Sequence, residues 1–393
     1  MRTSTMGAPD DVVRTVPHGE ERSERPRLRS IDAFRGAVLA LMVLTPATGD
    51  PAVYPFLRHA PWDGATASDL ILPTFLVTSG VSLAFLLRQP VSPATRWRLV
   101  RRLLRLIVLG LVYNAYGTTG FDLSALRYTG VLQMIGISGF VAAGVVLVAR
   151  CGRRDRPASV AAAAVGLTAL HGVGLRVLAD RCGDADACSP YVRWDRALLG
   201  AEHTYGGGAP GWDPEGIVTT VAATSLVLTG WLVGRRLVGA TRDRLPWIAA
   251  TTAAAGGALL GAAWILDGID AANKRLLTPA FVALAGGVAL VGIALFVAAF
   301  DLHTSSARRT QLRAIAFPLV SLGRNALIVY LLERFLLQTA ARVRIGERSL
   351  RAALLDALPG SDTTVHLAYT ATLLLVILAV TGALHWRGRY LAL

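Results

Sequence analysis

Residues 276–300 read LLTPAFVALAGGVALVGIALFVAAF, a run of 25 positions without a single charged side chain. About 20 apolar residues in a helix are enough to cross the hydrocarbon core of a bilayer, so this stretch predicts a membrane-spanning helix. Nine further apolar runs lie at 31–49, 69–88, 100–116, 129–149, 158–178, 216–238, 246–266, 314–340 and 364–386. The sequence therefore predicts an all-α, polytopic membrane protein with about ten transmembrane helices.

The composition fits the same class. Hydrophobic residues make up 53% of the 393 positions and charged residues 17%, whereas a soluble domain carries about 25% charged residues. The short alternating segments of a transmembrane β-barrel are absent from the sequence. The net charge of +14 does not indicate nucleic-acid binding, because the basic residues lie in short clusters between apolar runs and form no patch with interleaved aromatics.

The basic residues predict the orientation. With the N-terminus in the cytoplasm, the inner segments carry 25 basic residues and the outer loops carry 11. Basic residues favour the cytoplasmic side of a membrane, so we expect both termini to lie inside. Residues 1–29 have no apolar core and predict a disordered cytoplasmic tail, followed by a membrane domain over residues 30–393.

The three cysteines do not suggest a metal site, because no Cys-x-x-Cys spacing occurs. Cys182 and Cys188 share one outer loop, and Cys151 falls in an inner segment. Two interpretations stay open for the outer pair. They form a disulfide, which the outer side allows, or they are two free thiols in a mobile loop.

A histidine in the first outer loop is the leading candidate for chemistry. It lies in Tyr54-Pro55-Phe56-Leu57-Arg58-His59-Ala60-Pro61-Trp62-Asp63-Gly64, and an imidazole can take or give a proton near neutral pH. Trp62 can anchor the loop at the membrane interface. Asp63 or Asp69 could accept a hydrogen bond from one ring nitrogen and fix the tautomer. The alternative is a histidine that only tolerates the headgroup region.

Polar side chains inside apolar runs form a second group of candidates, since they are costly in a membrane and tend to be functional. They are Asn114, Gln133, Arg324, Asn325, Glu333 and Arg334. The alternative for the amides is hydrogen bonding between helices. At the start of the first run, Asp32 and Arg35 lie one helical turn apart, where Arg35 either pairs at the surface or meets an anionic ligand.

Two acidic residues precede the sixth apolar run. Asp213 and Glu215 could bind a cationic group of a substrate, or they could cap the helix that follows. We expect His203, in the same loop, to be solvated. A phosphate-binding loop, an HExxH motif and a serine nucleophile elbow are all absent from the sequence, which argues against a membrane ATPase, metalloprotease or serine hydrolase.

Six motifs, taken in order, resemble the heparan-α-glucosaminide N-acetyltransferase family with its bacterial multi-span relatives. They are Arg29–Gly36, His59–Gly64 followed by Asp69-Leu70, Gly130–Gly136, Asp213–Gly216, Asn273-Lys274 and Gly323–Ala326. The resemblance implies that residues 30–393 are a transmembrane acyltransferase domain in a bacterial plasma membrane. It implies transfer of an acetyl group from cytoplasmic acetyl-CoA to an amino sugar or related glycan on the outer side, with His59 as the active-site histidine.

The resemblance also implies roles for other residues. Thr45 stands where the family usually carries asparagine, and a hydroxyl lacks the paired donor and acceptor of an amide. The expected catalytic group is His59, Thr45, Asp63 and Asp69. The expected binding group for substrate and acetyl-CoA is Asp32, Arg35, Trp62, Gln133, Asp213, Glu215, Asn273, Lys274, Arg324 and Asn325, with no metal.

In the expected reaction, the phosphates of acetyl-CoA lie near Arg35, Arg101 and Arg102, and the pantetheine arm passes Gln133 and Asn325. His59 then removes a proton from the incoming amine as general base, which we prefer, or takes the acetyl group as nucleophile. The alternatives are a transporter or flippase for a sugar or lipid-linked intermediate, and a non-catalytic relative. The expected partners are the bilayer, acetyl-CoA and a glycan acceptor, with no nucleic acid, and the sequence leaves a homodimer open.

Overall fold

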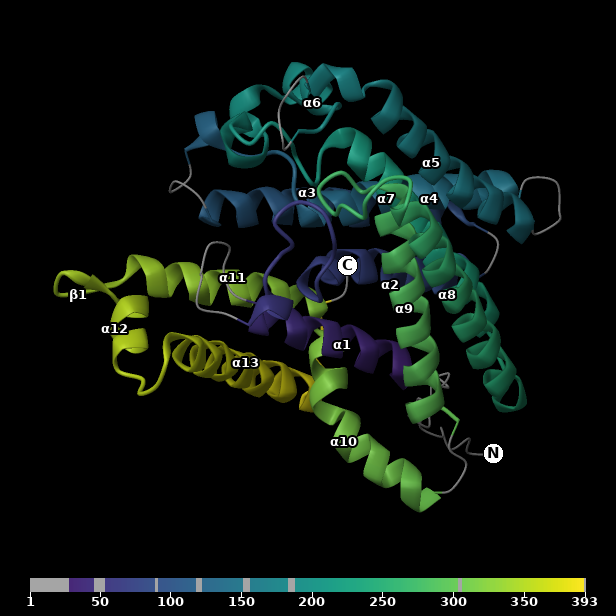
Figure 1. Cartoon of the computed structure of the whole chain (residues 1–393). Helices are drawn as coiled ribbons and strands as arrows, with labels where there is room; N and C mark the ends of the chain where they lie inside the picture. The colour runs from purple at the N-terminus through teal and green to yellow at the C-terminus, as the bar shows by residue number, and fades with distance from the viewer. Residues whose placement is uncertain are drawn as a thin grey trace, which may run out of the picture.

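The computed structural model describes residues 28–45, 54–88, 91–117, 122–150, 156–182, 188–302 and 306–391. These residues form an almost wholly helical molecule (Figure 1), as the apolar runs predict. The predicted tail up to residue 27 and Cys151 lie outside the described residues. The helices are α1 (Arg29–Leu44), α2 (Ile71–Leu86), α3 (Pro93–Gly117), α4 (Val131–Ala149), α5 (Pro157–Val177), α6 (Val192–Leu199), α7 (Ile217–Leu237), α8 (Leu245–Asp267), α9 (Pro279–Phe300), α10 (Ser306–Arg324), α11 (Ala326–Arg342), α12 (Leu350–Asp356) and α13 (Asp362–Trp386). A short hairpin of β1 (Arg344–Ile345) and β2 (Arg348–Ser349) follows α11.

Each predicted span contains a helix, but the helices differ in length and polarity. Among the described residues, seven helices are long and apolar enough to cross a membrane, and the α10–α11 pair raises the number to eight. The seven single helices are α2 and α8, each with the turn before it, and α4, α5, α7, α9 and α13. The remaining two predicted spans are shorter or more charged, since α1 has 16 residues and α3 carries five arginines. The protein is therefore an all-α polytopic membrane protein.

The ninth apolar run is not one helix, contrary to the continuous span expected over 314–340. It bends by 75° between α10 and α11. Asn325 lies at the bend with non-helical dihedral angles (φ −109°, ψ 30°). Its side-chain Nδ2 donates to the Ser321 carbonyl at 3.0 Å. An asparagine can satisfy freed backbone groups in this way, so a break is tolerated inside an apolar segment.

Glycines allow two of the helix crossings to be very close. An added Cβ at Gly80 of α2 or Gly230 of α7 would lie 1.9 Å or 1.8 Å from a backbone oxygen of the other helix. The α1–α10 crossing is built in the same way, because Gly36 and Gly323 each face backbone of the opposite helix. Small residues let helices pack backbone to backbone. Such close packing matters in a membrane, because the hydrophobic effect does not drive helices together in lipid.

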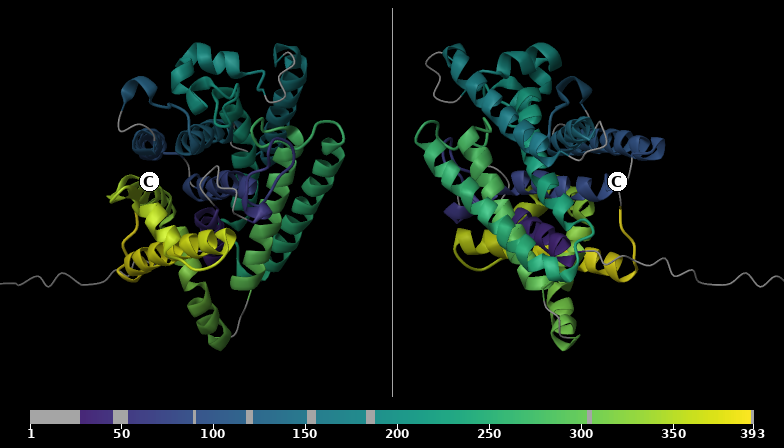
Figure 2. Two further views of the ribbon diagram at one scale, coloured as in Figure 1. Left: turned by 60° about the vertical axis from the view of Figure 1, so that its left-hand side comes forward. Right: turned by 90° about the vertical axis from the view of Figure 1, so that its right-hand side faces the viewer.

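The loops gather at two ends of the bundle. The loops after α1 and α8 meet at one end, where the Gly64 N–H donates to the Ala272 carbonyl at 2.7 Å. The loops after α3 and α5 meet there too, through Tyr128 N–H and the His203 carbonyl at 2.9 Å. Figures 1 and 2 show this end beside α6, opposite the start of α10. We call it the histidine end.

Exposed tryptophans mark two levels along the bundle. Trp247 and Trp264 on α8 are 62% and 82% exposed, and 17 residues of helix separate them by about 26 Å. That distance approaches the ~30 Å hydrocarbon core, and tryptophans collect at both of its boundaries. The histidine end is the Trp264 end, because α8 ends three residues after Trp264 and the α8–α9 loop follows.

We predict that Gly230→Ala destabilises the protein. The new methyl group would lie 1.8 Å from the Val77 carbonyl oxygen, so α2 and α7 must separate. Overpacking of this kind costs about 1–3 kcal/mol and should lower the thermal unfolding midpoint in detergent. Gly257→Ala is the matched control, since no other helix comes within 4 Å of its added methyl group. Equal midpoints in the two variants would contradict the close crossing.

Candidate functional site

A buried carboxylate shapes the loop that carries His59. Asp69 lies in the 3-10 turn just before α2 and is 1% exposed. Its Oδ1 lies 2.8 Å from His59 Nδ1, and its Oδ2 accepts from the backbone N–H groups of Ala60 and Thr66, each at 3.0 Å. The His59 side chain keeps 32% of its surface exposed. Asp69, and not Asp63, is therefore the hydrogen-bond partner of the histidine.

Asp63 joins two loops instead. Its Oδ1 accepts from Asn273 Nδ2 at 3.1 Å. Asn273 Oδ1 in turn accepts from the backbone N–H groups of Arg275 and Leu276, and Asn273 pairs with Gly64 in an isolated bridge. Gly64 has φ +89°, a left-handed conformation that favours glycine. The two motif residues thus fasten the α8–α9 loop to the histidine loop.

Lys274 brings a positive charge to the His59–Asp69 pair. Its Nζ lies 3.4 Å from Asp69 Oδ1 and 3.2 Å from His59 Nδ1. Burial lowers the pKa of Lys274, and the nearby Asp69 carboxylate opposes that shift. Since Nδ1 faces both partners, Nε2 is the ring nitrogen left for a substrate, and it has no hydrogen-bond partner among the described residues.

Thr45 lies behind the histidine loop. It follows the last residue of α1, and its Oγ1 bonds to the Leu41 carbonyl at 2.9 Å and lies 3.2 Å from Ser68 Oγ. Ser68 Oγ donates to the Leu57 carbonyl at 2.6 Å. Thr45 therefore supports the turn that carries Asp69 and makes no hydrogen bond to His59 in the described structure.

A second polar cluster lies at the same end. Arg127 Nη2 bridges Asp213 at 2.6 Å and Glu215 at 2.5 Å. Asp213, 1% exposed, also accepts from Thr129 Oγ1 and from the backbone N–H groups of Tyr205 and Glu215. Burial opposes the charge of Arg127, but the two carboxylates raise its pKa.

This cluster changes the expected role of two residues. The Asp213 carboxylate is already saturated by protein donors, so its geometry is that of a loop anchor, whereas Glu215 also lies within electrostatic range of Lys274. Neither Arg127 nor Thr129 was among the predicted site residues. A lone arginine in a short outer loop was their only signal, and 86 positions separate Arg127 from Asp213.

The expectation that His203 is solvated is wrong, because its ring has protein partners. Its Nδ1 lies 2.8 Å from the Leu126 carbonyl, and its ring stacks on Tyr128 with centroids 4.0 Å apart. It joins the loop after α5 to the loop before α4. The expectation failed because a histidine in a long polar loop gives no indication of a distant stacking partner.

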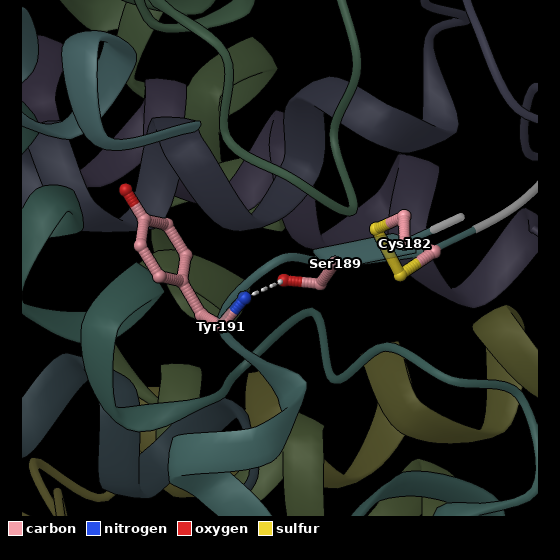
Figure 3. The surroundings of a disulfide bond; sticks show 4 residues. Cys182, Ser189 and Tyr191 are labelled. Carbon is pink, nitrogen blue, oxygen red and sulfur yellow. Dashed lines mark hydrogen bonds between the residues drawn. A yellow bond between two sulfur atoms is a disulfide. The ribbon is translucent and has the colours of Figure 1, made fainter. Parts of the chain in front are cut away.

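Cys182 and Cys188 form a disulfide, one of the two alternatives that the sequence left open. Cys182 is bonded to Cys188, and Figure 3 shows Ser189 and Tyr191 directly beyond the bridge. Ser189 N–H donates to the Gly211 carbonyl at 3.1 Å, and Tyr191 Oη donates to the His171 carbonyl at 2.9 Å. The disulfide loop is therefore fixed both to α5 and to the segment that carries Asp213.

The remaining predicted residues lie away from His59. Arg35 Nη2 donates to Ser82 Oγ at 2.9 Å and lies 3.6 Å from Asp32. Arg324 stacks over Tyr390 with 3.7 Å from Cζ to the ring centroid. Asp32 and Arg35 lie in the first half of α1, whereas the loop that carries His59 follows the C-terminal end of α1. Arg102 on α3 is within electrostatic range of Arg35.

Two amides in the bundle have unsatisfied atoms. Both side-chain polar atoms of Gln133 and the Oδ1 of Asn325 are buried without a hydrogen-bond partner among the described residues. Asn114 differs, because its Nδ2 donates to the Arg127 and Thr129 carbonyls at 2.8 and 2.7 Å. Buried polar atoms without partners are costly, so Gln133 and Asn325 keep the ligand role that the sequence suggested as a hypothesis.

Comparison with known proteins agrees with the motifs. Residues 27–173 match the family model described as heparan-α-glucosaminide N-acetyltransferase, catalytic. This range includes His59, Asp69 and Gln133. This part of the chain is therefore similar to the catalytic region of the heparan-α-glucosaminide N-acetyltransferases.

Two curated proteins with that name are similar to part of the chain. The Homo sapiens protein is 33% identical over 127 residues, which is 30% of this chain and 19% of the relative. The Mus musculus protein is 31% identical over 152 residues, or 36% and 23% of the two lengths. The similarity thus spans about a fifth of each heparan-α-glucosaminide N-acetyltransferase.

The chemistry that this arrangement allows is proton transfer or nucleophilic attack at the histidine. A half-exposed imidazole is held at Nδ1 by a buried carboxylate, which leaves Nε2 for a reacting group. In the part of the chain that the structure describes, no group of three His, Cys, Asp or Glu side chains could hold a metal ion.

One carboxylate near the site predicts a pH-dependent stability. Asp195 of α6 is 2% exposed and accepts from the Ile217 N–H at 2.8 Å, at the start of α7. Burial raises its pKa to about 6, Ile217 N–H opposes the shift, and Asp213 adds to it. The folded state binds this proton more tightly than the unfolded state. The resulting stability is complete below about pH 4 and is lost as the pH rises through about 6.

Asp195→Asn should therefore raise the unfolding midpoint at pH 7.5, because the amide oxygen still accepts from Ile217 N–H and carries no charge. The difference from the wild type should shrink towards pH 4.5. Thermal unfolding in detergent across this pH range measures it. A variant that is less stable than the wild type at pH 7.5 would contradict the assignment.

Proposed function

We propose that this protein transfers an acetyl group from acetyl-CoA on the cytoplasmic side to the amino group of an amino sugar or related glycan on the extracytoplasmic side. The observation that carries the proposal is the His59–Asp69 pair, with 2.8 Å between Nδ1 and Oδ1 and with 32% of the His59 side chain exposed. The family of the catalytic model supplies the reaction class.

The geometry supports His59 as a general base. When the amine attacks the thioester carbonyl, a C–N bond forms and Nε2 takes the ammonium proton that the amine must lose. The C–S bond then breaks, and the imidazolium returns the proton to the leaving thiolate. Asp69 holds the ring and balances its transient charge, and Lys274 fixes Asp69 from the other side. An acetyl-histidine formed by direct attack of Nε2 is the alternative path.

The proposed sidedness rests on two features of the described loops. The disulfide-bearing loop and the histidine loop belong to the same end, and disulfides persist on the oxidising side of a membrane. The other end carries Arg35 and Arg102 close to one another, which fits the polyphosphate of acetyl-CoA. Basic residues also favour the cytoplasmic side. We place the protein in a bacterial plasma membrane, as the resemblance of its motifs to the bacterial multi-span relatives implies.

A transporter or flippase is the second candidate function, and one observation favours it. The α10–α11 break at Asn325, with a buried unpaired Oδ1, resembles the discontinuous helices from which transporters build their substrate sites. In the acyltransferase interpretation, the same break gives room and polar atoms for the pantetheine arm. Uptake of labelled sugar without any acetylated product would favour the transporter.

We predict that His59→Ala lowers the rate of acetyl transfer by about 100-fold or more, since a positioned general base contributes about 10²–10⁴. Purified protein with labelled acetyl-CoA and glucosamine measures it. Asp69→Asn should lower kcat strongly, because the amide no longer fixes the tautomer. Asp63→Asn is the matched control. The amide oxygen of the new asparagine still accepts from Asn273 Nδ2, and residue 63 makes no hydrogen bond to His59 in the described structure.

The outcomes separate the hypotheses. Full activity in His59→Ala would exclude both the base and the nucleophile. Equal losses in Asp69→Asn and Asp63→Asn would show that the loop, and not the His59–Asp69 pair, is what activity requires. Labelled enzyme trapped in the absence of acceptor would favour the acetyl-histidine path. No transfer and no acetyl-CoA binding by the wild type would indicate a non-catalytic relative.

A further inference from the structure

Three aromatic rings and an arginine lie together beside the histidine loop. Tyr205 stacks on Trp212 with centroids 4.9 Å apart, and Trp62 lies 6.0 Å from Trp212 at an angle of 60°. The Arg275 guanidinium lies over both tryptophans, 5.0 Å from Trp212 and 5.7 Å from Trp62. All four side chains are partly exposed. We call them the aromatic platform.

The platform is held rigidly and close to the reacting nitrogen. The backbone N–H of Tyr205 donates to Asp213 Oδ2 at 2.9 Å, so the saturated carboxylate next to Trp212 fixes both ends of the Tyr205–Trp212 stack. Arg275 Nη1 donates at 2.9 Å to the carbonyl of Ala60, the residue after His59. Arg275 also follows Lys274 directly in the chain. A ligand on the platform would therefore lie next to His59.

The charge of the platform is not neutralised by protein. Arg127 and Arg275 are both half-buried arginines at this end, and each lies over an aromatic ring. Arg127 bridges two carboxylates, whereas Arg275 has no carboxylate partner in the described ranges and donates only to one backbone carbonyl. The fork of a guanidinium matches a carboxylate or phosphate. The spare donors of Arg275 thus suit an anionic group of a ligand.

We propose that the aromatic platform is the acceptor subsite and that it selects a sugar ring bearing an anionic substituent. The apolar C–H face of a pyranose packs against the tryptophan surface, its carboxylate or phosphate pairs with Arg275, and its amino group reaches His59 Nε2. The inference rests on the proposed function for the reaction, but the binding step stands separately. Stacking alone would also suit a purine base, but the proposed site for the donor phosphates lies at the opposite end, and the experiment distinguishes the two ligands.

The test compares a neutral and two anionic amino sugars, namely glucosamine, muramic acid and glucosamine 6-phosphate. Their binding to the full chain in nanodiscs is measured by calorimetry without donor, and transfer is measured with acetyl-CoA. Arg275→Gln should raise the Kd and KM of the anionic sugars about tenfold and leave glucosamine within twofold. Arg193→Gln is the matched control, an exposed arginine of α6 at the same end, and should change none of them.

The tryptophan variants test the stacking. Trp212→Leu should weaken all three sugars, and Trp212→Phe should retain most of the affinity while preserving the fold. Equal effects of Arg275→Gln on neutral and anionic sugars would overturn the selectivity. A rise in the KM of acetyl-CoA alone would assign the platform to the donor. If the wild type binds anionic sugars with this pattern but transfers no acetyl group, the subsite stands and the proposed reaction fails.

Discussion

The Asp69 carboxylate accepts hydrogen bonds from two backbone N–H groups of its own loop and contacts an imidazole and an ammonium group from two different loops. A carboxylate that is 1% exposed is tolerated only when its oxygens are satisfied. Here some of the groups around the carboxylate belong to His59 and Lys274, which the proposed reaction requires close together. The same interaction therefore closes the 58–69 loop, orients His59 and attracts Lys274. Loss of this charge would free all three at once.

The rest of the fold places the loops where this interaction can form. Glycine contacts draw α2 against α7 and α1 against α10, so the ends of these helices deliver loops from distant parts of the sequence to one surface. Arg127, Asp213 and Glu215 then link the loop before α4 to the segment before α7. The disulfide and Asp195 hold the intervening segment. The arginines around Arg35 remain at the opposite end, separated from His59 by most of α1.

Much of the fold and part of the site could be predicted from the sequence. Apolar runs of membrane length predicted each of the seven helices that are long and apolar enough to cross a membrane in the described part of the chain, because length and hydropathy suffice for that. The break at Asn325 was missed, since one amide in an apolar run does not show whether the helix continues. Asp63 and Asp69 were equivalent in sequence, and only the turn at Ser68–Leu70 points Asp69 at the imidazole. The Arg127–Asp213 pair and the Trp62–Trp212 contact join residues at least 86 positions apart, and no local pattern encodes such contacts.

In the proposed mechanism, an acetyl group crosses the membrane within this protein and emerges at His59. Proteoliposomes with a single known orientation test it most directly, when labelled acetyl-CoA is supplied on one side and a membrane-impermeant amino sugar on the other. We expect transfer only with the donor at the arginine end and the acceptor at the histidine end, and none when both are supplied at the histidine end. Transfer with both substrates on the histidine side alone would contradict the account.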